Sequence, residues 1–322
     1  MRRNQSILVA IPAHNEEPSV DRVLPAALEH GLPVLLVDDG STDSTAARAS
    51  AWPVELVRNS VNAGYGRVMR DILAYAEGRN FDWVVTMDCD EQHEHRLIPA
   101  FVDAIRRDDA DIISGSRYLS RFSSDQPAPG DRREINRMIT REINAALQGL
   151  LGCDLTDSFC GFKAYRTRAC RALRLDADGY EFPMQFWVQS AANRLRVREI
   201  AVPRLYLDAS RSFGDGLDDA EVRLAHYRST LARELERCKG RLASSGARCN
   251  CAPHARQHTR AHERGRSAHH KQLPSLSSCP PERQCRPRMA SLAPRVHSCS
   301  IEIGAVSAWL RWGLRRSHRT SE

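Results

Sequence analysis

Asp88 and Asp90 stand one residue apart, directly after the apolar run at residues 84–87. A short apolar run of this kind predicts a strand buried on both faces of a parallel sheet. Residues two apart on a strand point to the same face, so both carboxylates are expected to converge on one hard cation. Two carboxylates, phosphate oxygens and water are a usual ligand set for Mg²⁺ or Mn²⁺. The pair alone leaves a second interpretation open, in which the acids only cap the next helix.

The preceding and following segments supply elements that could hold such a pair at the edge of a sheet. Apolar stretches predict strands at 6–11, 33–37, 54–58 and 111–116, besides the run that ends at Asp88. Helices are expected at 20–29, near 44–51, at 67–78 and at 97–107. Repeated strand-helix-strand units with apolar strands predict an α/β fold with a mostly parallel, doubly wound sheet and flanking helices. Sheets of this kind bind ligands at the carboxyl ends of their strands.

The pattern changes after residue 118. A polar segment with two prolines at 120–130 indicates a loop. An amphipathic helix is predicted at 132–151, and its first half carries Arg132, Arg133, Arg137 and Arg141. A further strand at 198–207 and a closing amphipathic helix at 218–238 follow. Either helix could lie on a membrane surface, and packing on the core explains their apolar faces equally well.

The charge is distributed unevenly along the 322 residues. Residues 239–322 hold 16 Lys and Arg against 4 Asp and Glu, whereas residues 1–238 hold 31 against 36. The last segment also mixes His, Ser, Pro and Cys without helical or strand periodicity, which predicts disorder. We therefore expect one domain at 1–238 and a basic tail at 239–322. Zinc binding by the tail or a basic arm for nucleic acid stays open as an alternative.

Several classes of protein are disfavoured by composition. No stretch approaches the roughly 18–20 apolar residues of a membrane span, and the first residues lack the pattern of a signal peptide. The cysteines of the main body show no paired spacing, which is typical of reduced thiols in a cytosol. The expected location is therefore the cytoplasm, with peripheral contact at the cytosolic face of a membrane as a possibility to test.

Four strand-end motifs occur in order along the chain. They are Pro12-Ala13-His14-Asn15-Glu16, Val37-Asp38-Asp39-Gly40-Ser41-Thr42-Asp43, Asn62-Ala63-Gly64-Tyr65-Gly66 and Asp88-Cys89-Asp90. This series resembles the family-two glycosyltransferases of GT-A fold. The resemblance implies a nucleotide-sugar site across the first three loops, with a divalent metal on the sugar diphosphate. It thereby favours the metal interpretation of the acidic pair over the helix cap.

Downstream motifs narrow the resemblance. The segments 111–118, 154–163, 179–182 and 199–203, followed by Arg211, resemble the dolichyl-phosphate mannosyltransferase and polyprenyl-phosphate glycosyltransferase branch. The match covers about residues 6–213. The Q-x-x-R-W motif of processive polysaccharide synthases is absent from the sequence. The branch implies transfer of a hexose, with inversion, from a GDP- or UDP-sugar to a lipid phosphate.

The resemblance implies a role for each site residue. The metal, Mg²⁺ or Mn²⁺, would be held by Asp88, Asp90 and Gln92, whose amide oxygen suits a hard ion. The residues implied to contact the nucleotide-sugar are Pro12, His14, Asn15, Glu16, Asp39, Gly64, Gly66 and Asp88. The acceptor phosphate would be bound by Arg117, Arg132, Arg133 and Arg211, since arginine suits bidentate phosphate contacts. Asp157 matches an acid that the family places on the acceptor side.

Departures from the branch keep other functions open. The sequence lacks the C-terminal membrane spans that many members carry, and no basic residue closely follows Arg211. A saccharide or other hydroxyl acceptor would need a carboxylate base, for which Asp157 is the first candidate. Two hypotheses of other classes are a non-catalytic nucleotide-sugar binder and a nucleic-acid binder acting through the tail. No specific nucleic acid is expected for the favoured interpretation.

Overall fold

A seven-stranded sheet in the order β3-β2-β1-β4-β6-β5-β7 lies at the centre of the fold. The structure, a computed structural model, describes residues 5–206 and 216–245. The strands are β1 (Ile7–Ala13), β2 (Val34–Asp38), β3 (Glu55–Arg58), β4 (Trp83–Thr86), β5 (Ile112–Ser116), β6 (Lys163–Arg166) and β7 (Val197–Ala201). Their neighbours pair in parallel except at β6, which runs antiparallel to both β4 and β5. The expected mostly parallel sheet is confirmed.

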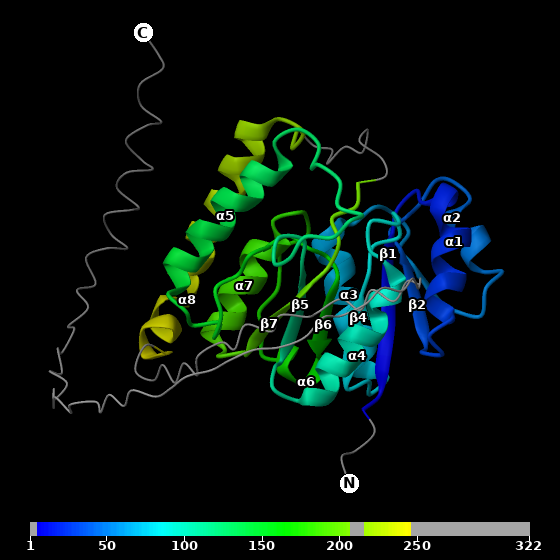
Figure 1. Cartoon of the computed structure of the whole chain (residues 1–322), viewed down its shortest axis with the longest axis horizontal. Coiled ribbons are helices and arrows are strands. Elements are labelled where there is room, and N and C mark those ends of the chain that lie inside the picture. Colours follow the sequence, from blue (N-terminus) through cyan, green and yellow to red (C-terminus); the bar gives the residue numbers. More distant parts are fainter. Residues whose placement is uncertain (1–4, 207–215, 246–322) are drawn as a thin grey trace, which may run out of the picture. The chain divides into compact units, whose positions relative to one another are not determined.

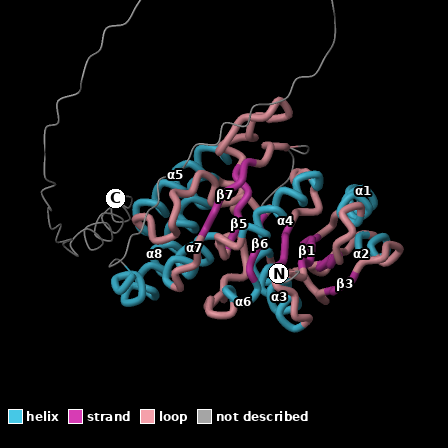
Figure 2. The backbone as a smooth tube through the Cα atoms, turned by 60° about the horizontal axis from the view of Figure 1, so that its bottom comes forward, coloured by secondary structure: helices cyan, strands magenta, loops and turns pink. Residues whose placement is uncertain are grey.

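Helices cover both faces of this sheet. The α-helices are α1 (Glu17–Leu28), α2 (Thr45–Ala49), α3 (Tyr65–Gly78), α4 (Ile98–Arg107), α5 (Arg132–Leu147), α6 (Thr167–Cys170), α7 (Phe182–Ala192) and α8 (Ala220–Ser245), and η1 (His95–Leu97) is a 3₁₀ turn. Successive strand residues alternate between two cores, as Leu8 packs with α3, α5 and α7 while Val9 packs with α1 and α4. Figure 1 shows α5, α7 and α8 grouped beside β7, with α1 and α2 on the β2 side. Figure 2 shows the same grouping from a second direction.

The observed bounds change one argument about the acidic pair. Strand β4 ends at Thr86, so Asp88 and Asp90 lie in the turn that follows it rather than on the strand. The alternation of side chains along a strand therefore does not orient them. Glu91 adopts a left-handed backbone conformation with φ of 61°, which reverses the chain after Asp90. The turn, and not the pleat, decides where both carboxylates point.

The sequence analysis does not predict β6, α6, α7 or η1, and several other elements differ in extent. The antiparallel strand β6 is only four residues long, and α7 is buried all round, so neither shows the periodicity that marks an amphipathic element. Helix α5 ends at Leu147 because Gln148 and Gly149 both have positive φ. Helix α8 continues beyond the predicted boundary at 238, to Ser245.

The apolar faces of α5 and α8 pack against the protein core. Ile135, Ile139 and Ile143 of α5 and Leu231 of α8 are buried in one core with α7. Neither helix therefore presents that face to a membrane, which corrects one of the two interpretations of these helices. Within residues 5–206 and 216–245, none of the helices combines the length and the hydropathy that crossing a bilayer requires.

Candidate active site

A cavity of about 180 Å³ opens at the carboxyl edge of the sheet, between β4, α5 and α8. Its polar lining combines Asp88 and Gln92 with Arg117, Arg132 and Arg223. The remaining lining residues, mostly aromatic or apolar, are Tyr65, Ile135, Asn136, Phe159, Gly161, Tyr180, Pro183, Tyr206 and Tyr227. The sequence-predicted acidic turn and two predicted arginines thus face one cavity. Acidic and basic side chains that line one small cavity suit a ligand that carries both phosphate and a bound cation.

The Asp88 side chain is positioned by its own turn and by β6. Its backbone N–H donates to Nδ1 of His93 at 2.9 Å. Gly161, two residues before β6, lies against the Asp88 carboxylate. A Cβ at Gly161 would come within 2.8 Å of both carboxylate oxygens. The carboxylate is therefore confined between His93 and a glycine that leaves just enough room for it.

His93 was not assigned a role from the sequence, although it belongs to the same acidic segment. The ring is buried and stacks on Phe162, with ring centroids 5.2 Å apart. Burial lowers the pKa of His93 to about 4, so the ring is neutral near pH 7. Because Nδ1 accepts from the backbone of Asp88, the proton lies on Nε2, 3.6 Å from Oδ2 of Asp88. His93 thus holds the turn through a hydrogen bond and, because its ring is neutral, adds no positive charge beside Asp88.

Of the other two predicted metal ligands, Gln92 lines the cavity and Asp90 does not. Oδ1 of Asp90 accepts from the backbone N–H of Gln92 at 3.0 Å, and Gln92 itself lines the cavity. Glu91, which lies between Asp90 and Gln92 in the sequence, forms an ion pair with Arg22 and so connects the turn to α1. Among the described residues, no group of three or more His, Cys, Asp or Glu could hold a metal. The predicted set contains only two such residues, Asp88 and Asp90, because its third member is the amide of Gln92. All three side chains offer oxygen ligands, which fit Mg²⁺ or Mn²⁺.

The loops after β1 and β2 are joined by hydrogen bonds between residues of the first two motifs. His14 Nδ1 donates to the carbonyl of Asp39 at 2.8 Å, and Asn15 Oδ1 accepts from the backbone of Thr42 at 2.9 Å. Glu16 is buried and accepts from Ser19, while Pro12 pairs with Val37 in the sheet. None of these residues lines the cavity. Their contact with a nucleotide stays a prediction.

Asp39, Gly64 and Gly66 make contacts within the protein that the sequence did not predict. The buried Asp39 carboxylate accepts from Asn59 at 2.8 Å and from the backbones of Ala63 and Gly64 at 2.9 Å. A Cβ at Gly64 would lie 2.4 Å from the carbonyl of Asp178, and one at Gly66 would lie 2.3 Å from that of Ala177. The close approach that these glycines allow is therefore to the 177–178 backbone.

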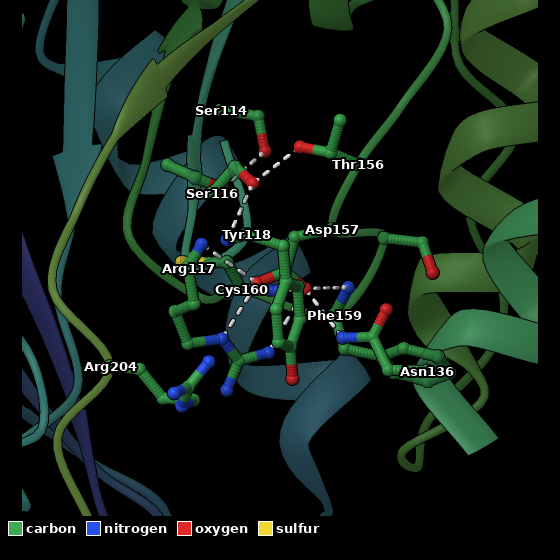
Figure 3. Close-up of polar contacts among 12 residues, drawn as sticks. Ser114, Ser116, Arg117, Tyr118, Asn136, Thr156, Asp157, Phe159, Cys160 and Arg204 are labelled. Atoms are coloured by element: carbon green, nitrogen blue, oxygen red, sulfur yellow. Dashed lines mark hydrogen bonds and ion pairs between the residues drawn. The ribbon is translucent and has the colours of Figure 1, made fainter. Parts of the chain in front are cut away.

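Arg117 and Asp157 form a buried ion pair beside the cavity (Figure 3). Nε and Nη2 of Arg117 donate to the two Asp157 oxygens at 2.6 and 3.0 Å. Asp157 is fully buried and also accepts from Asn136 Nδ2 at 2.6 Å and from three backbone N–H groups. Although burial opposes its ionisation, Arg117 holds the pKa of Asp157 well below its usual range.

That arrangement corrects the assignment of Asp157 as a candidate base. A general base needs a pKa near the working pH and an oxygen within reach of the acceptor hydroxyl. The Asp157 oxygens are enclosed by donors from the protein, and their pKa is lowered. We conclude that Asp157 positions Arg117, whose Nη1 lies 3.3 Å from the Tyr206 hydroxyl at the cavity wall.

The other predicted arginines have different fates. Arg132, at the start of α5, lines the cavity. Arg133 is exposed and lies over the Tyr118 ring, with 5.9 Å from its guanidinium carbon to the ring centroid, and it does not line the cavity. Arg211 lies outside the described residues. Arg223 of α8 was missed, because only the packing of α8 against the start of α5, where Arg223 pairs with Asp131, brings it to the cavity.

The sheet order with one antiparallel strand, and the acidic turn at its carboxyl edge, define a GT-A-like glycosyltransferase. Residues 8–174 match the family described as Glycosyl transferase family 2, which is about half of the chain, and the protein belongs to that family. The predicted family and enzyme class are confirmed.

Named relatives resemble most of the chain. Undecaprenyl-phosphate mannosyltransferase of Micrococcus luteus is 29% identical over 255 residues, which cover 73% of this chain and 98% of that protein. Polyprenol monophosphomannose synthase of Mycolicibacterium smegmatis is 26% identical over 261 residues, covering 74% and 92%. Glucosyl-3-phosphoglycerate synthase of Mycobacterium tuberculosis, solved with Mn²⁺ and uridine diphosphate, aligns with a TM-score of 0.55 at 22% identity, over 73% of this chain and 81% of that one. The last likeness concerns the fold alone.

Proposed function

We propose that this glycosyltransferase moves a hexose from a GDP- or UDP-sugar to a polyprenyl phosphate, with inversion and with the help of Mg²⁺ or Mn²⁺. One observation carries the proposal: Arg117 and Arg132 face the same cavity as Asp88 and Gln92. Cations that suit an acceptor phosphate and oxygen ligands that suit a metal-bound diphosphate are thereby brought together. The names of the two relatives that resemble most of the chain support the lipid-phosphate acceptor.

The donor half of the site would use the acidic turn. Asp88, Asp90 and Gln92 would hold the divalent cation, which supplies positive charge to the diphosphate as it leaves. His93 and Gly161 keep Asp88 in place for that role. The loops that carry His14, Asn15 and Asp39, which hydrogen bonds join, would bind the nucleoside.

The acceptor half would need orientation rather than deprotonation. A phosphate monoester is largely ionised near pH 7, so its oxygen can attack the anomeric carbon without a general base. Arg117 and Arg132 would orient it, and attack from the side opposite the leaving group inverts the configuration. A hydroxyl acceptor lacks this advantage, and Asp157, the base considered for it, is held by Arg117.

Contact with the cytosolic face of a membrane is part of the same proposal, because a polyprenyl chain resides there. Leu119 is 45% exposed, and Arg121 and Arg133 are exposed near it. Arg133 lies over Tyr118, which places it beside the segment that carries Leu119 and Arg121. An exposed apolar residue with neighbouring cations suits a surface of anionic lipid headgroups.

A transfer assay tests the proposal. GDP- and UDP-hexoses are incubated with undecaprenyl phosphate in Mg²⁺, in Mn²⁺ or in EDTA, and the anomeric configuration of the product is determined by NMR. We expect metal-dependent transfer with inversion in the wild type and a loss of at least about 100-fold in Asp90→Ala. Asp103→Ala, which changes an exposed acid on α4, serves as the control. Full activity in EDTA or in Asp90→Ala would contradict the metal role, and transfer only to free sugars would contradict the acceptor.

A further inference from the structure

Glu199 of β7 holds the loop that carries Asp157. Its Oε1 accepts from the backbone N–H of Asp157 at 3.1 Å and of Thr156 at 3.0 Å. Its Oε2 accepts from the Thr156 hydroxyl at 2.9 Å. The loop has no regular secondary structure at these residues, so the Glu199 carboxylate satisfies amide groups that neither a helix nor a strand would satisfy.

The same carboxylate is linked to the strand end that carries Arg117. The Thr156 hydroxyl lies 2.5 Å from the Ser116 hydroxyl, which accepts from the backbone N–H of Tyr118 at 3.2 Å. Because the Thr156 proton points to ionised Glu199, the Ser116 hydroxyl must donate to Thr156. Figure 3 shows the contact between Ser116 and Thr156 close to the contact between Arg117 and Asp157. Glu199 therefore connects to both backbone segments that determine the geometry of the Arg117–Asp157 pair.

We propose that Glu199 is a positioning residue for the acceptor, which acts through Thr156 and Asp157 to aim the Arg117 guanidinium into the cavity. This inference rests on the proposed function, in which Arg117 binds the acceptor phosphate. Glu199 does not line the cavity, so it has no contact of its own with either substrate there. Its effect reaches the cavity only through the ion pair.

The ionisation of Glu199 gives this role a pH dependence. Burial raises the pKa of Glu199 to about 7, and the negative charge of Asp157 adds to the rise, while the donors of Thr156 and Asp157 oppose it. The thiol of Cys153, whose own pKa is raised by burial, also faces Glu199, with Asp154 and Arg198 near it. Above pH 7 the carboxylate accepts from all three donors. Below it, one oxygen carries a proton, and the loop is held less well.

Steady-state kinetics with the full chain tests the inference. In Glu199→Gln we expect the KM for undecaprenyl phosphate to rise on the order of 10-fold at pH 8, with a smaller effect in Thr156→Val. The ratio of this KM to that of the wild type should fall toward 1 at pH 6, where wild-type Glu199 is itself protonated. The acceptor phosphate titrates in the same range, and the ratio cancels that contribution because it is common to both proteins.

Three further measurements distinguish a loss of Arg117 positioning from a general disruption of the fold. The Kd for the nucleoside diphosphate with Mn²⁺ should match the wild type in both variants, which also shows that they fold. Adding Glu199→Gln to Arg117→Ala should change the KM no further, because the two residues act in series. Glu142→Gln, at a partly buried glutamate that pairs with Arg228 on α8, is the matched control.

The outcomes distinguish this inference from the proposed function. If Arg117→Ala leaves the KM for undecaprenyl phosphate unchanged, the acceptor role of the cavity is wrong. If Arg117→Ala raises that KM but the ratio for Glu199→Gln stays at 1 from pH 6 to pH 8, only the role of Glu199 is overturned. Additive effects of Glu199→Gln and Arg117→Ala would also overturn it.

Discussion

Asp157 shows how a buried carboxylate can hold a neighbouring site residue in place. Its carboxylate is fully buried, accepts two hydrogen bonds from the Arg117 side chain and one from Asn136, and closes the turn at Phe159 and Cys160. A buried charge of this kind is tolerated only while its partners are in place. The ion pair is therefore a structural requirement of the cavity as well as a way to orient Arg117.

Replacing Asp157 tests that requirement. Asp157→Asn leaves the Arg117 charge nearly buried and unpaired, so we expect the free energy of unfolding to fall by about 3–5 kcal/mol. Urea denaturation measures it. Asp103→Asn, which breaks an exposed pair with Arg106 on α4, should change stability by less than about 1 kcal/mol. Equal effects of the two substitutions would contradict the importance of burial.

The same pair predicts how wild-type stability depends on acid. The folded-state pKa of Asp157 is lowered, so its contribution is fully present above the unfolded pKa of about 3.9 and is lost as the pH falls through the folded value. The stability of the wild type should therefore decrease from about pH 5 downward more steeply than that of Asp157→Asn. Denaturation at several pH values checks this difference in slope.

At Gly161, one added methyl group should lower transfer activity while leaving stability nearly unchanged. A Cβ there would come within 2.8 Å of both Asp88 oxygens, and a side-chain carboxylate can move aside at little cost to the fold. In Gly161→Ala we expect transfer to fall by about 10–100-fold. The thermal midpoint should stay within a few degrees of the wild type. Unchanged activity would mean that the Asp88 position is not critical.

At the scale of elements, α3 shows why two glycines of one helix are not equivalent. Gly66 in its first turn contacts the 177–178 backbone, where a Cβ would lie 2.3 Å from the Ala177 carbonyl. Gly78 at its last residue has open space around the position of a Cβ. The first turn of α3 is therefore fixed to the loop before α7, while the last turn is not.

Alanine at each of these two positions provides a matched test. Gly66→Ala should lower the free energy of unfolding by about 1–3 kcal/mol, because backbone atoms must shift to admit the methyl group. Gly78→Ala should raise it by about 0.4–1 kcal/mol, through the lower entropy of the unfolded chain. Thermal denaturation of the two variants measures the difference in sign. A stabilising effect of Gly66→Ala would contradict the close contact.

At the scale of the whole molecule, the sheet order places the two halves of the site on either side of β4. The loops after β1 and β2 join through His14, Asn15 and Asp39 on one side. Arg117 after β5 and Arg132 of α5 stand on the other, with the acidic turn between them. In the proposed function, donor and acceptor groups would therefore meet near Asp88, although they come from segments far apart in the sequence.

Shortening the chain tests how far the transferase domain extends. We expect a chain ending at Ser245 to keep transfer activity and thermal stability. A chain ending at Cys238 should lose about 1–3 kcal/mol, because it lacks Leu242, which packs on the core, and Arg241, which contacts Gln189. Activity lost on removal of residues 246–322 would contradict a separate tail. Salt-sensitive nucleic-acid binding by the full chain alone would instead support a basic arm.

The sequence by itself determined the fold class, the order of most strands and helices, and the acidic pair after an apolar run, because these depend on local periodicity and short motifs. The apolar runs at 6–11 and 33–37, and the run before Asp88, are visible without a structure. The antiparallel β6, the buried α7 and the exact end of β4 were not predictable. Their positions are decided by long-range pairing, which leaves no periodic signal in a short segment.

The tertiary structure alone decided which groups each candidate site residue contacts. It turned Asp157 from a candidate base into the partner of Arg117, and it showed that Gly64 and Gly66 admit the 177–178 backbone. It also brought in His93, Gly161 and Glu199, whose roles depend on neighbours distant in sequence. The physical reason is the same in each case. Residue type limits which hydrogen bonds a side chain can make, but packing decides which partner is within 3 Å.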